Sequence, residues 1–354
     1  MKTYVFPGQG SQVRGMGAGL FDEFPDLTEK ADDLLGYSIK ELCLNDANKE
    51  LGKTQYTQPA LYVVNALSYY KRIRDTAETP DYLAGHSLGE FNALLAAGCF
   101  DFETGLDLVA KRGELMSQAT EGAMAAIVNV TRDTIESVLK ESGFDRVELA
   151  NVNAPDQVVI SGPAADIAAC QDLFRFGNAK CIRLNTSGAF HSRLMHPSQE
   201  RFENYLKGRT LSDPKIPVIA NLTARPYPGG AIVEYLSKQV CSAVLWSDTI
   251  QYLMSLSDTM AFVQIGPGDV LTKLTARIKQ HAEKAAMSGD PVALAEEKVA
   301  AWNRRHRIGT KATSAMAGYG ALITRTPAMV LFGHRAAIYM EEYKGYFDLD
   351  EIRV

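Results

Sequence analysis

Residues 81–97 read DYLAGHSLGEFNALLAA, a stretch that places a serine between two glycines. The pattern G-x-S-x-G at 85–89 is typical of a sharp turn from a strand into a helix, with the serine at its apex. Residues 82–84 have the character of a buried strand and 90–97 that of a packed helix. A tight turn with an incidental serine is the alternative, but the flanking strand and helix favour a nucleophile at Ser87.

The same turn predicts a site that stabilises negative charge. Side chains at Gly85 and Gly89 would clash with neighbouring backbone, which explains the two glycines. Ser87 then lies at a helix N-terminus, where backbone N–H groups lack partners and favour an anion. The N–H of Leu88 is therefore placed to stabilise an oxyanion on a substrate carbonyl.

Outward from this turn, strands alternate with helices. Residues 3–6 predict a strand that breaks into a glycine-rich loop, and this loop has neither the lysine of a P-loop nor the spacing G-x-G-x-x-G. Helical periodicity follows at 26–35, 58–74 and 102–119. The alternation predicts an α/β domain with a mostly parallel sheet covered by helices on both faces.

The character of the sequence changes near residue 123. From there to about 185 the order is strand, helix, two strands around a turn, helix and strand, which is the order of a ferredoxin-like βαββαβ unit. We therefore expect a ferredoxin-like subdomain at 124–190, inserted into a larger core formed by 1–123 and 191–280.

The C-terminal part differs again. Residues 281–304 contain few aromatic side chains and indicate a linker with some helix. Residues 305–354 contain short β-rich stretches separated by glycines, which predict a small meander or barrel. No motif for chemistry is present in this extension, and its role is not predicted.

Composition excludes several classes of protein. The 354 residues are 46% hydrophobic and 22% charged, with a formal net charge of −5, so no basic surface suggests nucleic acid. The N-terminus has no signal-peptide pattern, and no apolar run is long enough to cross a membrane. The five cysteines are odd in number and scattered, which indicates reduced side chains in the cytoplasm, and they form no metal-binding pattern with histidine.

A serine hydroxyl needs a neighbouring base to become a nucleophile. His191 follows a predicted strand at the point where the chain returns to the main sheet, and His196 is the local alternative. His86 is adjacent to Ser87 in sequence and points elsewhere from such a turn, so we interpret it as structural. No acidic residue stands between Ser87 and His191 in the order usual for hydrolases, which leaves a dyad oriented by a backbone carbonyl as a possibility.

Six motifs in order across residues 5–274 identify a family resemblance: VFPGQGSQ, YTQPALYVVNAL, GHSLGEFNAL, KRGELM, GAFHS and QIGPGDVLTKL. Together they resemble the malonyl-CoA:acyl-carrier-protein transacylases. Their amino-acid sequence is closest to that of the discrete, trans-acting acyltransferases of polyketide synthases. The resemblance implies a hydrolase-like α/β core with an inserted ferredoxin-like subdomain. It does not extend to 281–354.

The resemblance also implies a mechanism. Ser87 takes the malonyl group from malonyl-CoA with His191 as base, and the phosphopantetheine thiol of an acyl carrier protein then removes it, with no bound cofactor. Gln9 and the Leu88 N–H would form the oxyanion hole, worth about 3 kcal/mol per donor. The backbone carbonyl of Gln239 would hold the histidine tautomer.

Two further positions bear on the substrate. Arg112 is a lone arginine on an otherwise apolar helix, and the resemblance implies that it clamps the free carboxylate of malonate. A surface arginine whose stem covers the core is the alternative. In this family, the sequence Ala-Phe-His-Ser that contains Phe190 accompanies a preference for malonyl over methylmalonyl.

Two other functions remain open from the sequence. One is an acyl hydrolase of the same fold that releases stalled acyl groups; such relatives replace the arginine. The other is a non-catalytic module that docks carrier proteins, which an intact set of Ser87, His191, Gln9 and Arg112 disfavours. A polyketide pathway is favoured over fatty-acid biosynthesis.

Overall fold

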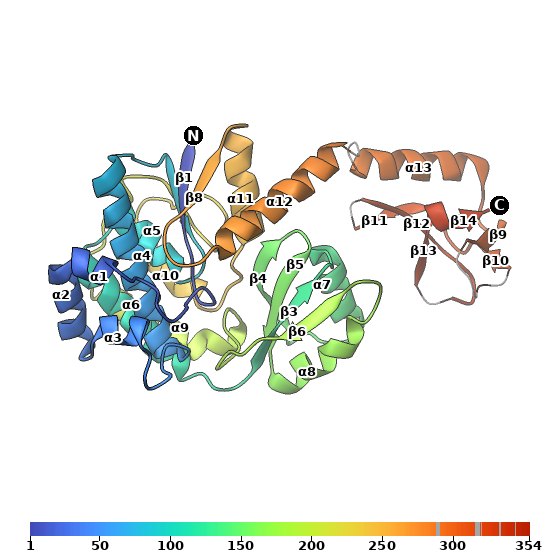
Figure 1. Ribbon diagram of the computed structural model, residues 1–354. Coiled ribbons are helices and arrows are strands. Elements are labelled where there is room, and N and C mark those ends of the chain that lie inside the picture. The colour runs from blue at the N-terminus through green and yellow to red at the C-terminus, as the bar shows by residue number, and fades with distance from the viewer. Residues whose placement is uncertain (288–290, 316–318, 320, 333, 344) are drawn as a thin grey trace. The chain divides into compact units, whose positions relative to one another are not determined.

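The computed structural model describes the chain except for residues 288–290, 316–318, 320, 333 and 344 (Figure 1). It divides into two compact units, Met1–Ile278 and Lys279–Val354. The division comes before the linker expected at 281–304. That interval holds the end of one helix, α12 (Val270–Met287), and almost all of another, α13 (Pro291–Arg305).

A parallel sheet forms the centre of the first unit. Its strand order is β7-β2-β1-β8, where β7 is Val218–Ile219, β2 Tyr82–Gly85, β1 Lys2–Phe6 and β8 Ala261–Gln264. All three strand pairs are parallel. Buried side chains such as Tyr4 and Phe6 anchor β1 in the core, as expected for strands covered on both faces. The parallel α/β core predicted from the alternating pattern is confirmed.

Helices surround this sheet, and those predicted near 26–35, 58–74 and 102–119 are present. α6 begins where Asp101 caps it by accepting a hydrogen bond from the Thr104 N–H. The helices of this core are α1 (Leu20–Glu23), α2 (Pro25–Leu35), α3 (Ile39–Leu44), α4 (Thr54–Thr76), α5 (Gly89–Ala96), α6 (Phe102–Ser117), η1 (Arg193–Met195), α9 (His196–Lys207), α10 (Ile232–Gln239), α11 (Trp246–Leu256) and α12.

The inserted subdomain has the predicted order of elements: β3 (Ala123–Val128), α7 (Arg132–Glu141), β4 (Glu148–Ala154), β5 (Gln157–Gly162), α8 (Ala164–Leu173) and β6 (Lys180–Arg183). Its sheet order is β4-β5-β3-β6, and every pair is antiparallel. Thr131 caps α7 through its side-chain oxygen. The subdomain has a hydrophobic core of its own, which includes Ile127, Ile135 and Ile160, and the ferredoxin-like prediction is confirmed.

The second unit combines α13 with short antiparallel strands. One sheet contains β10 (Leu322–Ile323), β9 (Lys311–Ser314) and β14 (Ile352–Arg353); the other contains β11 (Met329–Leu331), β12 (Arg335–Tyr339) and β13 (Tyr346–Asp348), and η2 (Leu349–Glu351) precedes β14. Its core includes Ala295 from α13 together with Ile338 and Phe347. The helix thus belongs to the packed unit and is not a free connection.

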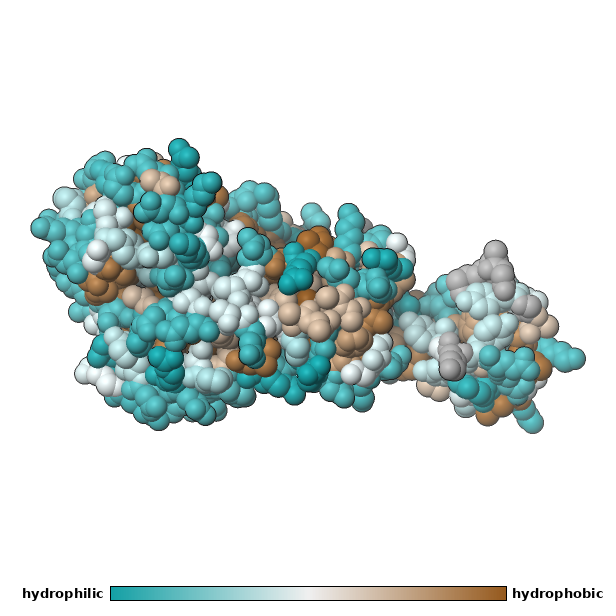
Figure 2. Space-filling view, turned by 90° about the horizontal axis from the view of Figure 1, so that it is seen from below, coloured by the Kyte–Doolittle hydropathy of each residue, from teal (hydrophilic) through white to brown (hydrophobic). Residues whose placement is uncertain are grey.

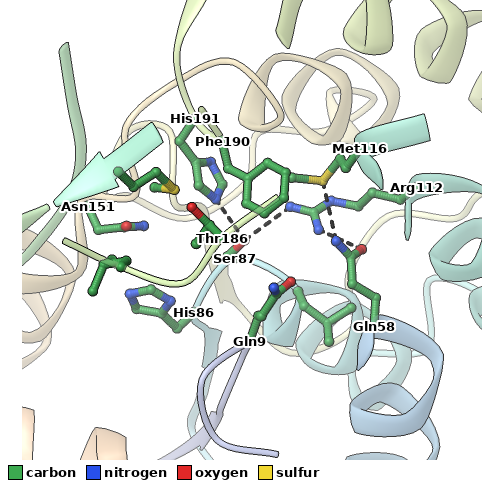
Figure 3. A pocket seen from close by; sticks show the side chains of 13 residues that line it. Gln9, Gln58, His86, Ser87, Arg112, Met116, Asn151, Thr186, Phe190 and His191 are labelled. Atoms are coloured by element: carbon green, nitrogen blue, oxygen red, sulfur yellow. Dashed lines mark hydrogen bonds between the residues drawn. The ribbon is translucent and has the colours of Figure 1, made fainter. Parts of the chain in front are cut away.

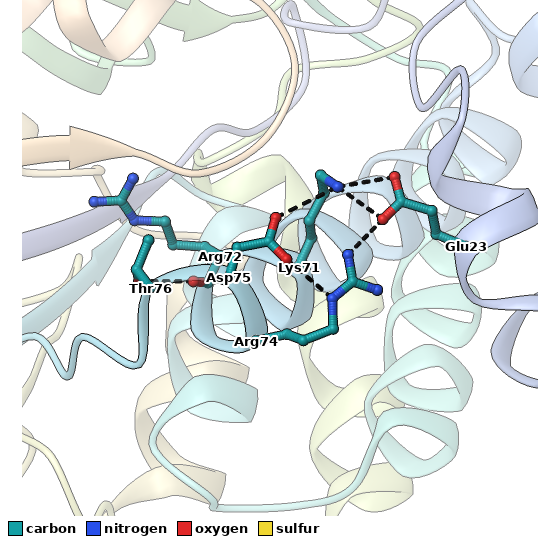
Figure 4. Close-up of polar contacts among 6 residues, drawn as sticks. All are labelled: Glu23, Lys71, Arg72, Arg74, Asp75 and Thr76. Atoms are coloured by element: carbon teal, nitrogen blue, oxygen red, sulfur yellow. Dashed lines mark hydrogen bonds and ion pairs between the residues drawn. The ribbon is translucent and has the colours of Figure 1, made fainter.

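Exposed ion pairs connect α1 with the C-terminal part of α4 (Figure 4). Lys71 Nζ lies 2.7 Å from a Glu23 carboxylate oxygen, and Arg74 donates to the same carboxylate. Asp75 accepts from Arg74 Nε at 3.0 Å. Exposed ion pairs contribute little stability individually, so we expect this group to add little to the stability of the fold.

Hydrophilic residues cover most of the face shown in Figure 2, with smaller hydrophobic areas between them. Among the described residues, no helix has the length and apolar character required to cross a membrane.

Candidate active site

The turn at 85–89 has the strained geometry that its glycines predict. Ser87 has φ 50°, in the left-handed region that non-glycine residues rarely adopt. A Cβ at Gly85 would collide with the backbone of Gly89, and one at Gly89 would collide with that of Phe6. Asn221 stabilises the turn, because its side chain accepts from the Ser87 N–H at 2.7 Å and donates to the Gly85 carbonyl at 2.6 Å. The turn thus presents Ser87 between β2 and α5.

His191 is the histidine that reaches this serine. Its Nε2 lies 2.8 Å from Ser87 Oγ. Its Nδ1 lies 2.9 Å from the carbonyl oxygen of Gln239 and 3.1 Å from that of Ser242. Two carbonyl acceptors require a proton on Nδ1, which leaves Nε2 free to accept one from the serine. This geometry is that of a dyad in which backbone carbonyls orient the base.

The helix end at α10 explains why no carboxylate is needed here. Gln239 is the last residue of α10, where carbonyl groups lack partners within the helix. The negative end of the helix dipole also favours the imidazolium that forms during proton transfer.

His191 is neutral in the resting site. It is 5% exposed, and burial together with the nearby positive charge of Arg112 lowers its pKa from 6.5 to about 3. An unprotonated imidazole is the form that can accept the serine proton.

The other two histidines near the motifs have different partners. His86 Nε2 pairs with Asn153 Oδ1 at 2.8 Å, and its ring packs against Trp246, in accordance with a structural role. His196 is exposed and pairs with Gln199 at the start of α9. The structure therefore brings His191, and not His196, to Ser87.

Arg112 lies inside the site and is only 1% exposed, so the surface alternative is wrong. Its Nη1 donates to Gln58 Oε1 at 2.8 Å, and its Nη2 donates to Gln239 Oε1 at 2.9 Å and to Ser87 Oγ at 3.1 Å. Its Nε is buried and has no hydrogen-bond partner among the residues that the structure describes. Burial lowers the pKa of Arg112 to about 10, so the guanidinium is still charged at neutral pH. The guanidinium therefore reaches Ser87 through Nη2 as a buried cation (Figure 3).

One pocket brings these groups together (Figure 3). The predicted oxyanion-hole residues Gln9 and Leu88 line it, and Leu88 is the N-cap of α5, a position at which backbone N–H groups lack carbonyl partners within the helix. The Gln9 amide donates a long hydrogen bond of 3.4 Å to Thr54 Oγ1. The lining comprises Gln9, Gln58, His86, Ser87, Leu88, Arg112, Met116, Met124, Asn151, Leu184, Thr186, Phe190 and His191.

Phe190 is 5% exposed and contributes its ring to this pocket. The ferredoxin-like subdomain contributes Met124 from β3, Asn151 from β4 and Leu184, which directly follows β6. The pocket is thus closed by both parts of the first unit, and aromatic and aliphatic side chains leave limited room beside the nucleophile.

Sequence reasoning missed the side chains that support the predicted ones. Asn221, Gln58 and Ser242 are polar residues far from Ser87 in the chain, and no motif with a known chemical role marks them. The side chain of Gln239 also accepts a hydrogen bond from Arg112, which the sequence did not predict. A polar residue on an otherwise apolar helical stretch, as Gln58 is in QPALYVVNAL, was the one available signal.

Comparison with known proteins places the chain in a family. Residues 3–309 match the acyl transferase domain family. A polyketide biosynthesis malonyl CoA-acyl carrier protein transacylase of Bacillus subtilis is 54% identical over 285 residues, which is 80% of this chain and 99% of that protein. The match continues past residue 280, where we expected the resemblance to end, and leaves residues 310–354 outside it.

Solved structures agree with this placement. A crystal structure of the malonyl CoA-acyl carrier protein transacylase from Burkholderia pseudomallei is 57% identical, with a TM-score of 0.78, over 79% of this chain and 98% of its own. A malonyl-transacylase in complex with its type II polyketide synthase acyl-carrier protein is 34% identical, with a TM-score of 0.74, over 78% and 92% of the two chains. The chain therefore belongs to the malonyl CoA-acyl carrier protein transacylases of the acyl transferase domain family.

Proposed function

We propose that this protein transfers a malonyl group from malonyl-CoA, through an ester on Ser87, to the phosphopantetheine thiol of an acyl carrier protein in polyketide biosynthesis. The observation that carries the proposal is the buried guanidinium of Arg112, 3.1 Å from the Ser87 hydroxyl. A cation held beside a nucleophile selects an acyl group that has its own negative charge. The curated relative from Bacillus subtilis supports the polyketide pathway.

Acylation begins when Ser87 Oγ attacks the thioester carbonyl while His191 Nε2 takes the hydroxyl proton. The negative charge that develops on the carbonyl oxygen is stabilised by the Leu88 N–H and the Gln9 amide. The C–S bond then breaks, the coenzyme A thiolate takes the proton from His191, and the malonyl group remains as an ester on Ser87. The carbonyls of Gln239 and Ser242 stabilise the imidazolium in between.

Transfer repeats these steps in the opposite direction. His191 takes the proton of the carrier's thiol, the sulfur attacks the ester carbonyl, and the same oxyanion donors stabilise the intermediate. The C–O bond breaks and His191 returns the proton to Ser87 Oγ. The residues of the site account for every proton, so the reaction needs no bound cofactor.

Substrate choice rests on two side chains. Arg112 pairs with the malonyl carboxylate, replacing part of its hydrogen bonding to the glutamines. Phe190 occupies the space that a 2-methyl branch would need, so methylmalonyl-CoA is disfavoured by a smaller factor than acetyl-CoA. We also propose a cytoplasmic location, which the five unpaired cysteines support.

Radiolabelled malonyl-CoA tests this function against hydrolysis by the same fold. We expect the label to form a stable ester on the enzyme and to pass to a holo carrier protein, whereas the apo carrier, which lacks the thiol, stays unlabelled. Release of most of the label as free malonate in the presence of holo carrier would identify an acyl hydrolase. Absence of any ester would indicate a docking module.

The pH dependence of acylation tests the state of His191. A histidine whose pKa lies at about 3 stays unprotonated well below pH 6.5, so the base is retained as the pH falls. Single-turnover acylation by malonyl-CoA should therefore stay flat from about pH 6 to pH 4.5, because loss of the base begins only near the lowered pKa. A fall of about tenfold per pH unit across this range would show instead that His191 titrates as a free imidazole with a pKa near 6.5. His191→Ala, expected to be about 10²–10⁴-fold slower, provides the baseline.

A further inference from the structure

The side chain of Gln239 links two charged residues that do not touch each other. Its Oε1 accepts from Arg112 Nη2 at 2.9 Å, while its Nε2 donates to Glu90 Oε2 at 2.6 Å and to the Ser87 carbonyl at 2.9 Å. These contacts fix which end of the amide faces each neighbour, because only the oxygen can accept and only the nitrogen can donate. Gln239 is 1% exposed, so water offers no alternative partners.

Glu90 is itself buried, with 1% of its surface exposed. It lies in the first turn of α5, three residues after the nucleophile. One carboxylate oxygen accepts from the Tyr227 hydroxyl, and the other accepts from Gln239 and from the Asn221 N–H, the latter at 3.3 Å. A buried carboxylate with this many donors is held in place and has no freedom to swing toward the guanidinium.

The charges of Arg112 and Glu90 therefore offset each other without a direct ion pair, because the neutral amide of Gln239 lies between them. Among the residues that the structure describes, no carboxylate lies within ion-pair distance of Arg112, and Glu90 is the group whose negative charge acts on it. Burial raises the pKa of Glu90 to about 7, while the hydrogen bonds from Tyr227 and Gln239 and the charge of Arg112 work in the opposite direction. The guanidinium itself donates to two amide oxygens, from Gln58 and Gln239, and to Ser87 Oγ.

We propose that Gln239 is the positioning residue for Arg112, and that its side-chain amide keeps the negative charge of Glu90 off the edge of the guanidinium where the substrate carboxylate binds. The inference rests on the proposed malonyl transfer and specifies how its selectivity is achieved. It makes Gln239 a specificity residue in addition to its backbone role toward His191.

The physical reason lies in competition for the same donors. A carboxylate in direct contact with Arg112 would form a strong charged hydrogen bond and would have to be displaced by malonate. An amide oxygen orients the guanidinium with a weaker bond that a substrate carboxylate can replace. The distant Glu90 still offsets part of the cost of burying a cation.

Exchange of the side chains at positions 90 and 239 tests the proposal without changing the number of carboxylates and amides in the site. The double variant E90Q/Q239E keeps one carboxylate and one amide in the same place and moves the negative charge onto Arg112. Both acetyl- and malonyl-CoA must use the same Ser87, so the loss of the bond from position 239 to the Ser87 carbonyl cancels in their ratio. We expect the ratio of kcat/KM for malonyl-CoA over acetyl-CoA to fall about tenfold or more, mainly through the KM for malonyl-CoA.

The single variant Glu90→Gln is the matched control. Its amide oxygen still accepts from Gln239 and its nitrogen faces Tyr227, so Arg112 keeps its position without a carboxylate nearby. We expect the wild-type ratio to be kept within about threefold when measured near pH 8, where Glu90 of the wild type is ionised. A fall equal to that of the double variant would overturn the proposal, because removal of the charge would then matter and its position would not.

A second carboxylate variant tests the same proposal if the double variant fails to fold. Gln58→Glu places a carboxylate on the opposite nitrogen of Arg112 and leaves Gln239, Glu90 and Ser87 in place. The same fall in the ratio is expected, and a wild-type ratio in either carboxylate variant would overturn the proposal. A wild-type enzyme with no preference for malonyl-CoA would instead contradict the proposed function, so the two failures are distinguishable.

Discussion

Ser87→Ala is expected to abolish the covalent malonyl-enzyme. Ser87 Oγ is the hydroxyl 2.8 Å from the His191 base, and it stands on the strained turn at the start of α5. Loss of the nucleophile from a serine site of this kind lowers turnover by about 10⁴-fold or more. Intact-protein mass spectrometry after incubation with malonyl-CoA measures the effect directly.

Ser187→Ala is a suitable control for that measurement. Ser187 is an exposed serine whose hydroxyl contacts Thr54, which also holds the Gln9 amide, so it lies close to the site without facing His191. This variant should form the malonyl adduct at the normal rate. Malonylation of Ser87→Ala at a comparable rate would place the nucleophile elsewhere.

Arg112→Ala should collapse the preference for malonyl-CoA over acetyl-CoA. A charged hydrogen-bonded contact between the guanidinium and the substrate carboxylate contributes about 1.5–3 kcal/mol. Acetyl-CoA forms no such contact and leaves the cation buried without a carboxylate. We expect the ratio of kcat/KM to fall by about 10- to 10²-fold, since each 1.36 kcal/mol corresponds to a factor of ten, while Ser87 can still be acylated by acetyl-CoA.

Arg112→Lys separates charge from geometry in the same assay. A lysine keeps the positive charge but cannot offer two parallel donors to a carboxylate. Its ratio should lie between those of the wild type and the alanine variant. An unchanged ratio in Arg112→Ala would show that another group binds the carboxylate.

The sequence predicts those parts of the fold that are determined by residues close together in the chain. The turn at Ser87 follows from two glycines that no other residue can replace there, and α6 follows from its periodicity and the Asp101 cap. The ferredoxin-like subdomain is recognisable because all six of its elements occur in order. Burial of Arg112 agrees with its spacing of about one turn from Val109 and Met116, although α6 also contains charged residues such as Lys111 and Glu114 and is therefore less apolar than the interpretation assumed.

The supporting residues of the site depend on tertiary contacts that no local pattern records. Asn221 and Tyr227 come from the segment after β7, and each meets a residue more than a hundred positions away. Glu90 resembles a helix-start acid that favours the dipole, and only the packed structure shows it buried against Gln239. The segment at 281–304 was expected to be a linker because it has few aromatic residues, yet small apolar side chains such as Ala295 suffice to pack α13.

The most direct test is to locate the acyl group when both thioesters are offered together. Wild-type enzyme is mixed with equal concentrations of malonyl-CoA and acetyl-CoA, digested, and mapped by mass spectrometry before and after addition of a holo carrier protein. We predict a malonyl ester on the peptide that contains Ser87, almost no acetyl ester, and loss of the malonyl ester once the carrier is added. Equal amounts of the two esters would contradict selection of the malonyl group by Arg112. A malonyl group on another residue would contradict Ser87 as the site of acylation.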